Sequence, residues 1–181
     1  SASLRSLFVV ALLATCGRIM AMNQADPDLW GHVQYGRDWL GNGALPRTST
    51  WNFTAQGYRW INHENLAELG MALAVDGFGP WGLTIGKYLL GLLVIGMIYR
   101  SGRQGSVTPA LMGCICLVIA LTMEFHWHFR PQAFGYVFFV ILAEILRRAF
   151  VDWQGPQRRI PIELLWLIPL MALWTNTHGS F

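Results

Sequence analysis

The sequence has 181 residues, of which 54% are hydrophobic and 13% are charged, and its formal net charge is +3. A typical soluble domain has about 25% charged residues, whereas a disordered chain combines few hydrophobic residues with a high net charge. The composition therefore excludes a disordered chain and disfavours a water-soluble domain. The small net charge gives no reason to expect a nucleic-acid partner. We predict an all-α integral membrane protein.

Five apolar stretches approach the ~20 residues that a helix needs to cross the hydrocarbon core of a membrane. They are residues 4–22, 80–99, 107–123, 131–147 and 161–175. The first stretch also has features of a signal peptide, because Arg5 precedes an apolar run that ends in small residues. The spans that follow favour a membrane helix. The chain starts at Ser1 and stops in the middle of a pattern, so we expect a fragment of a longer protein.

Arginine residues mark one end of the predicted spans. If the spans alternate in direction, seven arginines fall on one side of the membrane, namely Arg5, Arg100, Arg103, Arg147, Arg148, Arg158 and Arg159. The positive-inside rule makes that side cytoplasmic. We therefore predict a multi-pass protein with a cytoplasmic amino terminus.

All five histidines fall on the opposite, outer side, in three separate segments. They are His32, His63, His126, His128 and His178, and they are joined by Asp26, Asp28, Glu64, Glu68 and Glu124. Titratable side chains from distant segments that meet at one membrane face indicate a functional site. The alternative is that these histidines simply lie in the polar interface.

The long outer segment 23–79 has the pattern of two interfacial amphipathic helices. An Asp-Pro-Asp sequence favours a helix start with Asp26 as the N-cap. This first helix is predicted to reach Leu40, and its spacing places Asp28 and His32 on one face.

A loop and the second interfacial helix follow in the same segment. Residues 47–60 mix polar and aromatic side chains and predict a hairpin or an irregular loop. A helix is predicted from about 62 to 75, with Asn62 as its cap and with Glu64 and Glu68 on one face.

Several short motifs now resemble a known family. They are Asp-Pro-Asp-Leu-Trp-Gly-His at 26–32, Gly-Arg-Asp-Trp-Leu-Gly-Asn-Gly at 36–43, Leu-Pro-Arg-Thr at 45–48, Trp-Ile-Asn-His-Glu-Asn-Leu-Ala-Glu at 60–68, Phe-Arg-Pro-Gln-Ala-Phe at 129–134 and Asn-Thr-His-Gly-Ser-Phe at 176–181. Together they resemble the amino-terminal part of polytopic membrane glycosyltransferases of the C-type fold class, such as bacterial mannosyltransferase-like and aminoarabinose-transferase-like proteins. The resemblance covers most of the chain and implies a location in the bacterial inner membrane.

The resemblance implies that a sugar passes from a polyprenyl-phosphate carrier to an acceptor at the outer membrane face. In such enzymes a carboxylate just after the first span serves as the base or orients the acceptor. Asp28 best matches that position, and Asp26 is the second choice. A second acidic motif follows in related enzymes, and His63 and Glu64 stand at the comparable place. This chain has His-Glu-Asn there, where some relatives have Glu-Lys-Pro.

Sugar transfer from a lipid phosphate also needs donors that stabilise the phosphate leaving group. Arg130 is the best candidate, because it is the only arginine or lysine in the short outer loop 124–130 and a guanidinium fork suits phosphate oxygens. The alternative is that Arg130 anchors the chain in the interface. Further candidates for substrate contacts are Arg59, His63, Glu64, His32 and His178.

A divalent metal ion is a further expectation, although no cofactor is required. Glu124, His126 and His128 form one potential ligand group. Asp28, His32 and His178 add donors that suit zinc or manganese. The alternative is that these histidines bind lipid phosphate or backbone groups.

Two other functions compete with the enzyme. A membrane transporter would place titratable groups near the middle of the bilayer, where Arg18, Lys87 and Glu144 are the residues to consider. A non-catalytic membrane assembly protein would use the loop motifs for structure only. Transfer of sugar from a polyprenyl-phosphate donor separates the enzyme from both.

Overall fold

A computed structural model describes residues 2–21, 25–151 and 161–181 of the chain. These residues form seven α-helices and two short 3₁₀ helices and contain no β-strand, which confirms the all-α prediction. The helices are α1 (Ala2–Ile19), α2 (Leu29–Asn42), α3 (Asn65–Phe78), α4 (Pro80–Gln104), α5 (Pro109–Met123), η1 (Glu124–His126), α6 (Gln132–Phe150), η2 (Ile162–Trp166) and α7 (Leu167–Thr175). Met22, Arg158 and Arg159, which the sequence analysis used, lie outside the described residues.

Two segments of the described chain are long and apolar enough to cross a membrane. They are Pro80–Gln104 and Pro109–His126, the second of which combines α5 with η1. The apolar segment Ile162–Thr175 is shorter. Each predicted span coincides with one of the helices α1, α4, α5, α6 and α7, and the helix bounds differ from the predicted ones by a few residues.

The helices α1, α4 and α5 pack around a buried apolar core. Its best-buried members include Cys16, Met20, Ile95, Cys116 and Trp127. The Trp127 indole N–H donates to the backbone carbonyl of Lys87 at 3.3 Å. At Gly91 a Cβ atom would lie 2.8 Å from the Trp127 ring, so α4 accepts the indole where it has no side chain. This contact fixes the loop after η1 against α4.

A second, smaller core joins α2 and α3 to the start of α4. It contains Leu29 and Val33 of α2, Met71 of α3 and Leu83 of α4. The two helices approach each other closely at Gly36, where a Cβ atom would lie 2.2 Å from the Glu68 carbonyl oxygen. Only a glycine allows this separation of the two backbones.

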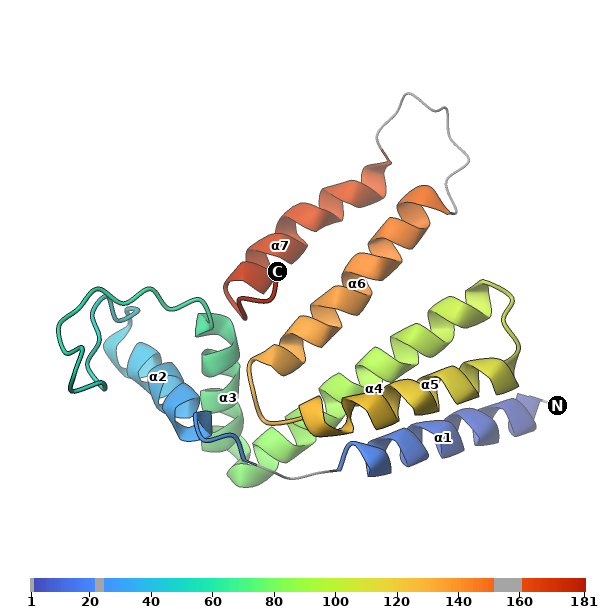
Figure 1. Cartoon of the computed structure of the whole chain (residues 1–181), viewed down its shortest axis with the longest axis horizontal. Coiled ribbons are helices and arrows are strands. Elements are labelled where there is room, and N and C mark those ends of the chain that lie inside the picture. Colours follow the sequence, from blue (N-terminus) through green and yellow to red (C-terminus); the bar gives the residue numbers. More distant parts are fainter. Residues whose placement is uncertain (1, 22–24, 152–160) are drawn as a thin grey trace.

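The helix ends gather at two opposite ends of the bundle (Figure 1). The carboxyl ends of α1, α5 and α7 and the amino ends of α4 and α6 point toward the α2–α3 pair. The amino terminus and the α4–α5 connection lie at the far end. Arg100, Arg103, Arg147 and Arg148 lie in the last turns of α4 and α6, and Arg5 lies in the first turn and a half of α1, so these five arginines are far from α2 and α3.

Both interfacial helices start later than the sequence pattern predicted. Helix α2 begins at Leu29, because the Asp26 side chain accepts a hydrogen bond from the Asp28 N–H at 2.9 Å in a turn that precedes the helix. Asp28, not Asp26, therefore occupies the N-cap position. Helix α3 begins at Asn65, because Asn62 forms the equivalent bond to the Glu64 N–H at 2.9 Å.

The segment between α2 and α3 is an irregular loop with one isolated antiparallel bridge. Thr48 pairs with Arg59, and the Ser49 N–H donates to the Tyr58 carbonyl at 2.8 Å. Gly57, at φ +82°, turns the chain between the two arms. The loop agrees with the predicted hairpin-like region.

The close approach of α2 and α3 can be tested with a matched pair of glycines in α2. We expect Gly36→Ala to destabilise the protein by about 1–3 kcal/mol, because the new methyl group meets the Glu68 backbone. At Gly31 a new methyl group would lie in open space. Gly31→Ala is therefore expected to leave the stability of the protein unchanged or to raise it by up to about 1 kcal/mol through helix propensity. Thermal unfolding of both variants in detergent measures the difference. Equal stabilities would show that the two helices are not packed as described.

Candidate functional site

Four titratable side chains from three segments meet beside the α2–α3 contact. We call His32, Glu64, Glu68 and His178 the acid–histidine cluster. His32 comes from α2, Glu64 and Glu68 come from the start of α3, and His178 follows α7. His32 Nδ1 lies 3.2 Å from Glu68 Oε1 and 3.7 Å from Glu64 Oε2. His178 Nε2 lies 3.6 Å from Glu64 Oε1.

The local backbone explains why these four side chains converge. The Asn62 amide accepts from the Glu64 N–H and donates to the Glu68 carboxylate, so one side chain positions both acids. The Leu66 N–H donates to the Asn176 carbonyl at 2.9 Å, and this bond holds the segment that carries His178 against the start of α3. The cluster therefore depends on pairing between parts of the chain that are more than 100 residues apart.

The two histidines of the cluster have opposite electrostatic environments. Burial alone would lower the pKa of His32, but its hydrogen bond to Glu68 and the charges of Glu64, Glu68 and Asp28 raise this pKa above its ordinary value. Burial lowers the pKa of His178, since the opposing charge of Glu64 is offset by those of His63 and His32. Relative to a free imidazole, the environment of His32 therefore stabilises the charged form and that of His178 stabilises the neutral form.

An ion pair between Asp26 and Arg130 lies next to the cluster. The Arg130 Nε–H donates to Asp26 Oδ2, and the Asp26 side chain is 4% exposed whereas that of Arg130 is 46% exposed. Burial alone would raise the pKa of Asp26, but the Asp28 N–H and the Arg130 guanidinium lower it below its ordinary value, with a further contribution from the charge of His32. The pair joins the start of α2 to the loop before α6.

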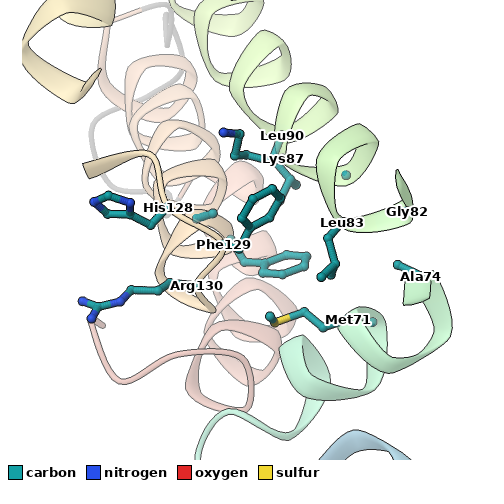
Figure 2. A pocket seen from close by; sticks show the side chains of 13 residues that line it. Met71, Ala74, Gly82, Leu83, Lys87, Leu90, His128, Phe129 and Arg130 are labelled. Carbon is teal, nitrogen blue, oxygen red and sulfur yellow. The ribbon is translucent and has the colours of Figure 1, made fainter. Parts of the chain in front are cut away.

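An apolar cavity of about 240 Å³ opens beside Arg130. It lies between α3, α4 and the 128–134 segment, and Figure 2 shows Phe129 and Leu83 inside it while the side chains of His128 and Arg130 point away from this lining. The Lys87 side chain is 3% exposed, and its ammonium lies 4.9 Å from the centre of the Phe129 ring. The cavity thus combines an apolar interior with basic side chains at its edge.

The structure brings most of the predicted site residues to this end of the bundle, but not all into contact. Arg130 pairs with Asp26 rather than with Asp28, which is exposed at the start of α2. His63 is exposed and lies beside Gly179. Arg59 is exposed in the loop and lines a separate hollow with Arg47.

The expected ligand group of Glu124, His126 and His128 does not assemble. Within the described ranges 2–21, 25–151 and 161–181, the metal-ligand type side chains that lie within 4.8 Å of one another form one group, His32, Glu64 and Glu68. The reason is local: the η1 turn buries Trp127 and leaves His126 exposed.

The sequence analysis placed Glu68 on the outer side but did not choose it as a metal ligand or a substrate contact. Glu68 is 4% exposed and contacts both His32 and Asn62. The available signal was its spacing of four residues from Glu64, which places both acids on one side of α3. That spacing also fits a solvated helix face, so the partner on α2 was needed to identify it.

In comparisons with known proteins, no family model, no curated protein and no solved structure matches the chain.

The two aspartates near α2 lie in different environments, since Asp26 pairs with Arg130 and Asp28 is exposed. Their substitutions should therefore change the stability of the protein by different amounts. We expect Asp26→Asn to destabilise the protein by about 1–3 kcal/mol at neutral pH, because it removes the charged partner of Arg130. Asp28→Asn, at an exposed position, should change stability by less than about 0.5 kcal/mol.

The effect of Asp26 should also depend on pH. Because its folded-state pKa is lowered, its stabilisation is present above the unfolded-state pKa of about 3.9 and is lost as pH falls through the folded-state pKa. Thermal unfolding of the wild type and Asp26→Asn should therefore differ at neutral pH and converge in acid. A constant difference would exclude ionised Asp26 as the source of the stabilisation.

Proposed function

We propose that the chain forms part of a polytopic membrane glycosyltransferase that takes a sugar from a polyprenyl-phosphate donor at the outer membrane face. The observation that carries the proposal is the Asp26–Arg130 pair at the edge of an apolar cavity. A lipid phosphate has an apolar chain and an anionic head, and the cavity with its basic edge offers a complement to each. The motif resemblance described above supports the same class.

In this proposal the helices α1, α4, α5 and α6 cross the membrane, and η2 and α7 enter it together as a shorter apolar segment. The arginines at the far end of the bundle then face the cytoplasm, together with the amino terminus. The α2–α3 pair lies in the outer interface, where exposed tryptophans such as Trp30 and Trp81 suit the headgroup region. The location that fits best is the bacterial inner membrane.

Arg130 would bind the phosphate of the donor. Its Nε–H already donates to Asp26, which leaves the two terminal nitrogens of the guanidinium for phosphate oxygens. As the bond between the sugar carbon and the phosphate oxygen breaks, negative charge develops on the lipid phosphate leaving group, and a fixed guanidinium stabilises it. Asp26 would act by positioning Arg130.

Asp28 would act on the acceptor. Transfer requires that a hydroxyl of the acceptor attack the sugar carbon while its proton passes to a base or is oriented by one. Asp26 is a weak base because Arg130 and the Asp28 N–H lower its pKa, whereas Asp28 is exposed at the start of α2. Asp28 lies near enough to His32 to affect its pKa, so it borders the acid–histidine cluster.

The test is a transfer assay in membranes that contain the natural protein, with a panel of radiolabelled polyprenyl-phosphate sugars and isolated envelope acceptors. We expect Arg130→Gln to lower kcat about 10²–10³-fold and Asp28→Asn to lower it about 10²–10⁴-fold. Arg130→Lys should keep the ion pair with Asp26 and part of the activity, because the positive charge remains. It should lose the rest of the activity, because an ammonium lacks the fork geometry that suits phosphate oxygens.

Arg37→Gln is the matched control, since Arg37 is a half-exposed arginine of α2 that pairs with Asp76 on the surface. It should leave transfer within about twofold of wild type, because exposed ion pairs contribute roughly 0–1 kcal/mol. Folded protein is quantified for every variant by size-exclusion chromatography. Absence of transfer from every donor, or full activity of Asp28→Asn and Arg130→Gln, would contradict the proposed function.

A further inference from the structure

The acid–histidine cluster has the spacing of a coordination shell. His32 Nδ1 lies 3.2 Å from Glu68 Oε1 and 3.7 Å from Glu64 Oε2, and the donor atoms of His32, Glu64 and Glu68 all lie within 4.8 Å of one another. His178 lies beside this group, with its Nε2 3.6 Å from the other oxygen of Glu64. Four ligands at ~2.0–2.2 Å from a tetrahedral ion are roughly 3.3–3.6 Å apart. Three side chains therefore already have the spacing of ligands to one ion, and His178 stands next to them as a fourth donor.

We propose that His32, Glu64, Glu68 and His178 bind one divalent transition-metal ion, with zinc as the preferred ion and manganese as the alternative of the same class. Two imidazole nitrogens and two carboxylates are ligands that these ions accept, whereas calcium and magnesium prefer oxygen alone. The site is independent of the proposed sugar transfer, and it replaces Glu124, His126 and His128 as the metal ligands.

The charges of the cluster favour a cation in addition to the geometry. The two glutamates bring two negative charges close together, and Glu68 is almost fully buried. A buried uncompensated charge is costly. A divalent ion bound by two neutral imidazoles and two carboxylates leaves no net charge.

The surroundings orient the proposed ligands. Asn62 bonds to the Glu68 carboxylate and, through its carbonyl oxygen, to the Glu64 N–H, as outer-shell residues of metal sites do. His178 Nε2 faces Glu64, whereas its Nδ1 is buried and has no hydrogen-bond partner within the described part of the chain. An ion bound by His178 would therefore sit on Nε2, the nitrogen that faces the glutamates.

A metal ion here would tie together three segments that the chain separates widely. It would connect α2, the start of α3 and the segment after α7, which are now held by the Leu66–Asn176 backbone bond and by ion pairs. Because such an ion binds the folded protein and not the unfolded chain, its binding should raise the thermal stability.

The experiment uses the full chain purified in detergent and stripped of metal with EDTA. Isothermal titration calorimetry with zinc chloride should give a stoichiometry near one ion per chain. Zinc should also raise the Tm of the protein. Cobalt chloride should produce the visible absorption bands of a four-coordinate Co²⁺ site with nitrogen and oxygen ligands. Both readouts are independent of enzymatic activity.

Ligand and control variants separate this site from other histidines. His32→Ala and Glu68→Gln should each lower zinc affinity more than about 100-fold, and Asn62→Ala should lower it about 10–100-fold. The double variant Glu124→Gln, His126→Ala should bind zinc as the wild type does. Circular dichroism checks that each variant is folded, and the isosteric Glu68→Gln keeps the test valid if His32→Ala does not fold.

Two results would overturn the metal site. One is the absence of stoichiometric zinc binding to the stripped protein, and the other is zinc binding that persists in both His32→Ala and Glu68→Gln. Failure of the transfer assay with intact zinc binding would contradict the proposed function only, and transfer without zinc binding would contradict the metal site only.

Discussion

The close approach of α2 and α3 at Gly36 is the contact on which the rest of the site depends. With no side chain at Gly36, the α2 backbone reaches the Glu68 carbonyl, and one turn earlier His32 reaches the Glu68 carboxylate. A bulkier residue at this position would push the two helices apart and would separate the Glu68 carboxylate from the His32 imidazole. The short range of hydrogen bonds makes this spacing decisive, because a shift of about 1 Å moves a pair from 3.2 Å to beyond bonding distance.

The second constraint is electrostatic and joins the loop system to the bundle. The ion pair of Asp26 and Arg130 connects residues 104 positions apart, and its carboxylate is shielded from water while its guanidinium is half exposed. Trp127 anchors the same loop by filling the space at Gly91. An apolar contact therefore positions the backbone, and a charged contact positions the side chain that the proposed donor phosphate would meet.

The acid–histidine cluster and the apolar cavity are neighbouring features with different chemistry. The cluster is polar, rich in carboxylate and held by Asn62, whereas the cavity is apolar and carries His128 and Arg130 at its edge. Their adjacency is compatible with the proposed transfer from a lipid-linked donor to a polar acceptor. The two aspartates border different features: Asp28 affects the pKa of His32 in the cluster, whereas Asp26 pairs with Arg130 at the cavity.

The sequence by itself determined the helical class and the end of the bundle at which the histidines lie, because apolar run length and arginine placement are local properties of the chain. It also placed Asp28 and His32 on one face of α2, because helical periodicity fixes that relation. Only the tertiary structure paired Arg130 with Asp26, brought Glu68 to His32 and His178 to Glu64, and left Glu124 and His126 apart. Those outcomes depend on which distant backbones pack together, and spacing along a single chain does not encode such distances.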